Sequence, residues 1–268
     1  MYLSTLLINV GDNPDRPRPG RLWLRNLHRV HQRLCMAFPS AARKDNDPNM
    51  LTPFAPEHFA AGHVHVERNG QVGFLFRIDP QPGDGVVILV LSALKPDWDY
   101  AFGLKPGLVD PRTGRPIGNA GHLLAAPPSE PRPLKLAINA GSRFHFRLVA
   151  NPVFRVREKS LDARGNRLEP KWVGKRVPVP GDEASLRNWL ERRAARAGFL
   201  LKDLTVIQCG YVYVNKTREA AGGQRLRSVR YEGLLEVTMP DEFRETLARG
   251  IGPAKAFGFG LLSIAPVR

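Results

Sequence analysis

The chain has 268 residues, a length that suits two domains of ordinary size, each with its own hydrophobic core. Its 40 lysine and arginine residues outnumber 25 aspartate and glutamate residues, so the formal net charge is +15 and a polyanionic partner is favoured, foremost a nucleic acid. Cys35 and Cys209 are too few and too far apart for a disulfide scaffold or a zinc site with paired ligands. The chain has no apolar run of about eighteen residues that could span a membrane, and residues 1–10 lack the features of a secretory signal peptide. We therefore expect no membrane association and a location in the reducing cytoplasm.

The first half of the chain alternates strand-like and loop-like segments. Residues 3–10 indicate a first strand, and the apolar spacing of residues 22–38 predicts one helix. The polar, proline-containing residues 40–65 predict a loop or short irregular elements. Two β-branched and apolar runs, residues 72–78 and 86–92, are separated by turn-forming residues and predict a hairpin.

A proline-rich, loop-like zone at residues 95–133 separates the two halves and predicts a domain boundary near residue 130. We expect an N-terminal domain at residues 1–130 and a C-terminal domain at residues 131–268. Each half combines antiparallel strands with one or two helices, which predicts an α+β fold of two tandem ferredoxin-like domains. The second domain is expected to contain strands at 134–139 and 143–151, a helix at 186–199, strands at 205–214 and 226–237, a helix at 241–249 and a last strand at 261–265. Alternation along the strand at 143–151 predicts Phe144, Phe146 and Leu148 on one face.

The densest positive charge lies in residues 155–176. Eight basic residues stand there against three acidic ones, Glu158, Asp162 and Glu169. Residues 162–166 indicate a turn, so the segment is either an exposed basic hairpin that follows a nucleic-acid backbone or a solvated surface loop. The basic residues are Arg155, Arg157, Lys159, Arg164, Arg167, Lys171, Lys175 and Arg176.

The C-terminal segment gathers glycines and one lysine, Lys255, before a strand-like run. Gly252, Gly258 and Gly260 allow a backbone with positive φ and close approach by a ligand such as a phosphate group. The alternative is a glycine-rich turn that only leads into the last strand. Because these glycines precede a strand instead of opening a helix, their order differs from a P-loop and disfavours a nucleotide triphosphatase.

The helix predicted at residues 22–38 carries two histidines that could serve in catalysis. At 100° per residue, His31 lies among the apolar side chains of one face, and His28 lies at the border of that face. His31 is then either a hydrogen-bonded packing residue or, where the helix faces a cleft between domains, a group that transfers protons near neutral pH. The carboxylate pairs at residues 45–47 and 97–99 lie beside prolines, so we predict turns there instead of a two-metal nuclease, and we expect no metal or other cofactor.

Segments from both ends and from the middle of the chain occur in the order of one known family. Together they resemble the CasE family of CRISPR precursor-RNA endoribonucleases, which belong to the type I-E Cascade complex. The final glycine segment with its Leu-Leu-Ser-Ile-Ala-Pro run is the most distinctive part of this resemblance. The segments are Met1–Ser4, Leu27–Leu34 with Phe38 and Pro39, Phe146–Pro152, and Gly250–Lys255 followed by Gly258–Pro266.

The resemblance implies two ferredoxin-like domains of the repeat-associated RNA-binding kind. It also implies metal-independent cleavage of CRISPR repeat RNA on the 3′ side of the stem-loop, by attack of the RNA 2′-OH. The products would carry 2′,3′-cyclic phosphate and 5′-OH ends. The family's catalytic histidine corresponds to His31, and where many members carry a tyrosine three residues earlier this chain has His28, which makes both candidate catalytic residues.

The same resemblance assigns the basic segment at residues 155–176 to a hairpin that meets the RNA stem. It assigns the glycine loop, with Gly252, Lys255, Gly258 and Gly260, to contacts with the RNA backbone. After cleavage, the protein would stay on the crRNA hairpin and join the other Cascade subunits. Two alternatives stay open: a catalytically silent subunit that only holds the RNA hairpin, and a basic structural protein of a ribonucleoprotein such as the ribosome.

Overall fold

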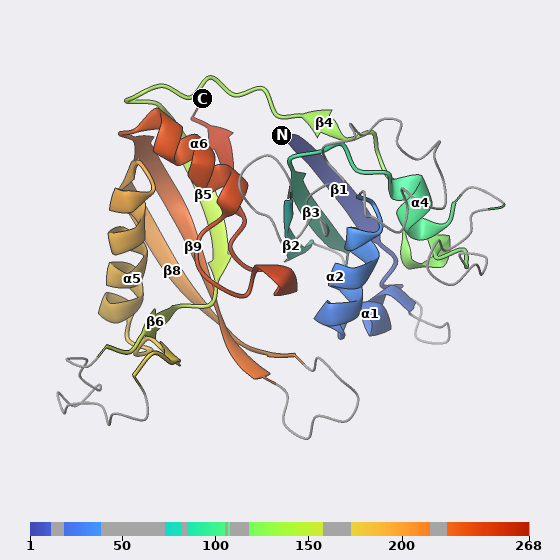
Figure 1. The fold of residues 1–268 in the computed structure, drawn as a ribbon, viewed down its shortest axis with the longest axis horizontal. Helices are drawn as coiled ribbons and strands as arrows, with labels where there is room; N and C mark the ends of the chain where they lie inside the picture. The colour runs from blue at the N-terminus through green and yellow to red at the C-terminus, as the bar shows by residue number, and fades with distance from the viewer. Residues whose placement is uncertain are drawn as a thin grey trace. The chain divides into compact units, whose positions relative to one another are not determined.

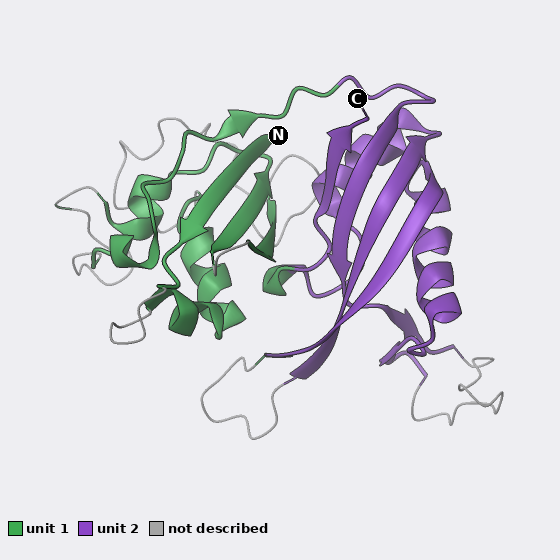
Figure 2. Ribbon diagram, turned by 180° about the vertical axis from the view of Figure 1, so that it is seen from behind, with its two compact units in different colours: residues 1–136, 214–223, 256–258 green, residues 137–213, 224–255, 259–268 purple. Residues whose placement is uncertain are grey.

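The computed structural model (Figure 1) describes residues 1–11, 19–38, 73–81, 85–104, 107, 118–157, 173–214 and 224–267. The chain forms two compact units, which Figure 2 draws in different colours. Unit 1 comprises residues 1–136, 214–223 and 256–258, and unit 2 comprises residues 137–213, 224–255 and 259–268. The C-terminal segment therefore contributes to both units.

The elements of unit 1 are β1 (Tyr2–Ile8), α1 (Pro19–Leu24), α2 (Leu27–Cys35), β2 (Phe74–Pro80), β3 (Val86–Ser92), α4 (Trp98–Phe102), the 3₁₀ turn η3 (Gly121–Leu123) and β4 (Arg132–Pro133). Its four strands form an antiparallel sheet in the order β2-β3-β1-β4. Helices lie between the first and second strands and between the third and fourth. This is the strand and helix order of a ferredoxin-like fold.

The elements of unit 2 are β5 (Arg143–Ala150), β6 (Val153–Arg155), β7 (Arg176–Pro178), α5 (Glu183–Arg196), β8 (Phe199–Val214), β9 (Gln224–Val237), α6 (Pro240–Arg249) and β10 (Leu262–Pro266) (Figure 1). The 3₁₀ turn η5 (Lys255–Phe257) begins in unit 2 and ends in unit 1. Four strands form a sheet in the order β10-β5-β9-β8, and β6 pairs with β7 in a separate two-stranded sheet. Without that insertion, the order along the chain is again ferredoxin-like. The predicted α+β class with two ferredoxin-like units is therefore confirmed.

Alternating burial explains how the strands form the two cores. On β1 the side chains of Ser4, Leu6 and Ile8 are buried and those between them are exposed, as expected for a strand with one covered face. On β5 the buried side chains are Phe144, Phe146, Leu148 and Ala150, which confirms the predicted alternation. In the sheet of unit 1, the buried Leu6 of β1 pairs with the buried Ile88 of β3.

The prediction of one continuous helix at residues 22–38 is wrong, because the segment forms two helices, α1 and α2. Asn26 interrupts it, because its side-chain oxygen accepts a hydrogen bond from the Arg29 backbone N–H at 3.1 Å and so caps a new helix, α2. Asparagine favours such a cap over a helix interior because its side chain competes for nearby backbone groups. Arg33 then ties α2 to α4 by donating from Nη1 to the Ala101 carbonyl oxygen at 2.9 Å.

The strand predicted at residues 134–139 is also wrong. Only Arg132 and Pro133 pair with β1, and Leu134 donates its backbone N–H to the Met1 carbonyl oxygen. Pro131 and Pro133 lack backbone N–H groups, which limits ladder hydrogen bonding at the start of this segment.

The hairpin predicted from residues 72–78 and 86–92 is confirmed as the antiparallel pair β2 and β3. In the proline-rich zone, Asp97 accepts a hydrogen bond from the Tyr100 backbone N–H at 3.0 Å and caps the short helix α4. Two predictions lie outside the described residues: the loop at residues 40–65, with the carboxylate pair at 45–47, and the turn at residues 162–166. None of the described helices combines the length and the hydrophobicity that crossing a membrane requires.

Candidate functional site

His31 lies in the middle of α2, on the face that packs into the core of unit 1. Its side chain is 7% exposed. The imidazole stacks on Phe74, with ring centroids 5.5 Å apart, and on Phe76, with centroids 6.2 Å apart. The position predicted from helical spacing, among the apolar side chains, is therefore confirmed, while the catalytic role of His31 stays a prediction.

Cys35 lies one turn after His31 on α2. Its Sγ atom is 3.5 Å from His31 Nε2, within hydrogen-bond range for sulfur. The two phenylalanine rings fix the plane of the imidazole, and the thiol contacts one of its nitrogens. A ring held in this way keeps one orientation, which is what a proton-transferring group needs.

His28 is the second predicted catalytic residue and lies in the first turn of α2, partly exposed. Residues three apart on a helix are neighbours on its surface, so His28 and His31 share one side of α2. His28 is the more accessible of the two to a ligand that approaches the helix.

Gly258 brings the C-terminal segment to the same aromatic cluster. Its φ is +83°, and a Cβ atom there would lie 3.2 Å from Cε2 of Phe76. Phe76 is one of the two rings that stack on His31. Within unit 1, the glycine segment and the histidine helix therefore meet through one phenylalanine, although they lie at opposite ends of the sequence.

The other glycines predicted to bind RNA have packing partners inside unit 2. A Cβ at Gly252 would lie 3.1 Å from the ring of Trp189, and a Cβ at Gly260 would lie 2.8 Å from the Ile251 carbonyl oxygen. Gly260 also donates its backbone N–H to the Val149 carbonyl oxygen. Close internal packing accounts for glycine at both positions, and their contact with RNA stays a prediction. Lys255 begins the 3₁₀ turn η5 and is partly exposed.

The basic segment begins and ends in the antiparallel pair of β6 and β7. Arg155 lies directly opposite Arg176, and Arg157 and Lys175 are exposed nearby. Like charges that face each other across strands repel, so such a pair is stabilised by an anion bound between or beside them. The other four predicted RNA-binding residues lie outside the described residues; they are Lys159, Arg164, Arg167 and Lys171.

Helix α5 anchors this basic pair of strands. Trp189 donates from Nε1 to the Val153 carbonyl oxygen at 3.0 Å, and Arg193 donates to the same oxygen at 3.3 Å. The Arg193 guanidinium lies 3.9 Å from the centre of the Trp189 ring, and burial lowers the pKa of Arg193. Arg193 therefore stabilises the position of β6 and contributes little to the exposed positive charge of β6 and β7.

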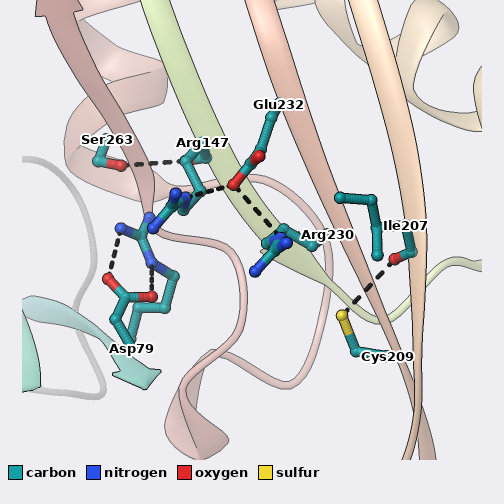
Figure 3. A network of polar contacts seen from close by, with 8 residues as sticks. Asp79, Arg147, Ile207, Cys209, Arg230, Glu232 and Ser263 are labelled. Carbon is teal, nitrogen blue, oxygen red and sulfur yellow. Dashed lines mark hydrogen bonds and ion pairs between the residues drawn. The ribbon is translucent and has the colours of Figure 1, made fainter. Parts of the chain in front are cut away.

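The sheet of unit 2 pairs much of its own charge. Glu232 Oε1 lies 2.5 Å from Arg147 Nε and 3.3 Å from Arg230 Nε (Figure 3). Glu236 similarly contacts Arg143 and Lys202. Residues 153–157 and 173–178, which contain β6 and β7, include basic residues and no acidic one.

Among the described residues, no three His, Cys, Asp or Glu side chains are close enough together to hold a metal ion.

Residues 1–266 match the model of a protein family described as "CRISPR associated protein". The chain belongs to this CRISPR-associated family.

Two curated relatives of this CRISPR-associated protein carry functional names. The CRISPR-associated endoribonuclease Cse3 of Thermus thermophilus is 31% identical over 207 residues, which cover 74% of this chain and 82% of the relative. The Cascade subunit CasE of Escherichia coli is 26% identical over 270 residues, which cover all of both chains. A solved structure of Thermus thermophilus Cse3, bound to an RNA that represents a pre-cleavage complex, has a TM-score of 0.61 and 26% identity, and the match covers 99% of this chain and all of that chain.

Sequence reasoning missed two parts of the site in this CRISPR-associated protein. Phe74 and Phe76, which hold His31, were predicted only as strand residues, although their spacing of two places them on one face of β2. The anchoring of β6 by Trp189 and Arg193 was missed as well, because a contact between distant segments leaves no local pattern in the sequence.

Proposed function

We propose that this chain is a metal-independent endoribonuclease that cleaves CRISPR precursor RNA on the 3′ side of the repeat stem-loop. The observation that carries the proposal is the position of His31, which is stacked on two phenylalanine rings, one of which, Phe76, lies beside Gly258 of the glycine segment. The similarity to Cse3, a relative named as a CRISPR-associated endoribonuclease, supports it. The basic strands β6 and β7 supply a surface for the RNA.

RNA contains its own nucleophile, so this reaction needs no cofactor. The 2′-OH loses a proton to a base while its oxygen bonds to the adjacent phosphorus, and the bond from phosphorus to the 5′ oxygen breaks as that oxygen gains a proton from an acid. The products are a 2′,3′-cyclic phosphate and a 5′-OH. In our proposal His31 is the general base or the general acid, and His28, on the same side of α2, is the candidate for the complementary proton transfer.

The proposed grip on the RNA comes from both basic strands and the glycine loop. Structured RNA is recognised largely by its shape and its phosphates, which suits exposed arginines on or beside a short pair of strands, here Arg155, Arg157 and Arg176. Tight binding also serves catalysis, because in-line attack by the 2′-OH requires a bent linkage held in place. Lys255 and Gly258 are the proposed contacts of the glycine loop with the RNA backbone.

We further propose that the product hairpin stays bound and that the complex joins other Cascade subunits. The support is the full-length similarity to CasE, which is named a Cascade subunit. In this proposal residues 1–130 form the domain with the catalytic helix, and residues 131–268 form the domain with the basic hairpin and the glycine loop.

A catalytically silent hairpin-binding subunit is the second candidate. The small exposed fraction of His31, 7%, favours it, because a buried imidazole reaches a substrate only at its remaining accessible edge. The two candidates differ in one readout. A silent subunit shifts the RNA hairpin in a native gel and leaves it uncut after long incubation.

The test of the proposed mechanism is incubation with labelled repeat RNA in excess EDTA. We expect one cut 3′ of the stem, at the rate seen without EDTA, and a product end that resists 3′ ligation until its cyclic phosphate is removed. A matched RNA with a single 2′-deoxy nucleotide at the cut site should bind equally and stay intact, because its nucleophile is missing. Cleavage of the deoxy RNA, or loss of cleavage in EDTA, would contradict the mechanism.

Neutralising the basic strands should weaken hairpin binding and reduce its dependence on salt. We expect the triple variant Arg155→Gln, Arg157→Gln, Lys175→Gln to lower the slope of log affinity against log salt by about 2–3, because each phosphate that is no longer neutralised lowers the slope by roughly one. Fluorescence anisotropy at several salt concentrations measures this slope.

The control for this triple variant of the protein removes three positive charges elsewhere on the chain. It is the triple variant Lys135→Gln, Lys202→Gln, Arg249→Gln, whose side chains belong to other exposed segments. Its slope should stay near the wild-type value. Equal slopes for the two triple variants would mean that net charge, and not the basic hairpin, governs binding.

A further inference from the structure

The long hairpin of β8 and β9 carries an exposed aromatic and basic cluster near its tip. Figure 1 shows that both strands extend beyond the end of α5, which covers the sheet of unit 2 farther along. On β8, Tyr211 is 44% exposed and Tyr213 is 66% exposed. Alternate residues of a strand point to the same side, so these two rings lie on one face of the hairpin.

Two arginines of β9 are already ordered against this face. The Arg225 guanidinium carbon lies 3.5 Å from the centre of the Tyr211 ring, and the Arg227 guanidinium carbon lies 5.9 Å from it. The Arg227 guanidinium beside the phenol holds the pKa of Tyr211 below its usual range. Arg227 also donates from Nη1 to the Val179 carbonyl oxygen at 2.5 Å.

These contacts connect the cluster with the basic strands of the same unit. Val179 follows β7 directly in the chain, and the nearby Gly181 carbonyl oxygen accepts a hydrogen bond from Gln208 of β8 at 2.9 Å. Arg227 of β9 and Gln208 of β8 therefore both hydrogen-bond to the residues that follow β7 in the chain. A strand of RNA that follows the arginines of β6 and β7 would reach these residues on the same unit.

The strand residues around the tip carry charge of one sign. Residues 204–214 and 224–231 contain three arginines and no aspartate or glutamate. Arg225 occupies one face of Tyr211, whereas Tyr213 has most of its side chain in solvent. A rigid pair of guanidinium groups beside an open aromatic ring combines a phosphate site with a stacking surface.

We propose that Tyr211, Tyr213, Arg225 and Arg227 form a binding site for an unpaired segment of RNA, with a base stacked on Tyr213 and a backbone phosphate held by the two arginines. The site rests on the proposed function for its ligand and lies on different elements from His31 and from β6 and β7. An unpaired segment is the occupant because a base inside a stem has both of its faces covered and cannot stack on a side chain.

The experiment compares three RNA probes by fluorescence anisotropy. They are the repeat hairpin with its single-stranded flanks, the same hairpin trimmed to its stem and closed by a non-nucleotide linker in place of the loop, and an unstructured oligoribonucleotide of unrelated sequence. We expect Tyr213→Leu to weaken binding of the flanked and unstructured RNAs by about five-fold or more, the loss expected for one stacked base. Binding of the trimmed hairpin should not change.

Two matched variants separate stacking from folding. Tyr213→Trp keeps an aromatic face and should bind as tightly as the wild type, whereas Leu200→Ala removes an exposed side chain at the other end of β8 and should change nothing. Unchanged binding of all three RNAs by Tyr213→Leu would overturn the site, and so would an equal loss for the trimmed hairpin. If the wild type neither holds nor cuts the repeat hairpin, the proposed function fails, yet a loss confined to Tyr213→Leu on the unstructured RNA still supports the site.

Discussion

Replacing His31 with alanine is expected to lower the rate of repeat-RNA cleavage by about 10²- to 10⁴-fold, the usual contribution of one positioned acid or base. The affinity for the RNA hairpin should change little, because the strands that we propose to bind it, β6 and β7, belong to unit 2. The measurement is a single-turnover cleavage rate, with hairpin affinity determined on the same preparations. This decrease is the largest effect on activity that the site predicts.

The surroundings of His31 require a second variant, because alanine leaves a gap between the helix and two phenylalanine rings. His31→Phe fills that gap with a ring of suitable shape and removes the capacity to transfer a proton, together with the contact to Cys35 Sγ. Both variants should show the large decrease in cleavage rate, whereas His122→Ala, at an exposed histidine in η3, should cut normally. Normal cleavage by His31→Phe would return His31 to a packing role and favour the silent subunit.

Local patterns predicted the elements that hold the candidate site. Helical spacing placed His31 among apolar side chains, and strict alternation placed Phe144, Phe146 and Leu148 on the buried face of β5. Both signals need only a few consecutive residues, because burial of one face repeats with the period of the element. The interruption at Asn26 was missed because the apolar spacing continues on both sides of the cap.

The assembly of the site could not be predicted in the same way. Gly258 packs against Phe76, and Trp189 donates a hydrogen bond to the Val153 carbonyl oxygen. The residues of each pair are far apart in the sequence, so no local pattern predicts that they meet. The glycines illustrate the limit most clearly. Positive φ values were expected for the glycine loop, but the neighbours that exclude a side chain, such as Trp189 at Gly252, follow only from the packed fold.

Replacing Gly258 with valine should impair both folding and cleavage. The backbone there has a φ of +83°, which costs a side-chain-bearing residue about 1–2 kcal/mol, and the new Cβ would lie 3.2 Å from Phe76. Overpacking of this kind adds about 1–3 kcal/mol of destabilisation. Because Phe76 also stacks on His31, a displaced ring should misplace the imidazole, and an error of about 1 Å can cost about 100-fold in rate.

Gly141 provides the matched control, since it isolates the backbone contribution. Its φ is +81°, nearly that of Gly258, but no atom lies within 4 Å of the position that a Cβ would occupy. Gly141→Val should therefore lose stability through backbone strain alone and keep the wild-type cleavage rate at temperatures where it is folded. Thermal unfolding and single-turnover cleavage of both variants measure the two effects separately. If Gly258→Val is no less stable than Gly141→Val and cuts at the wild-type rate, then Phe76 does not transmit the packing of the glycine segment to His31, and Gly258 serves only as a turn.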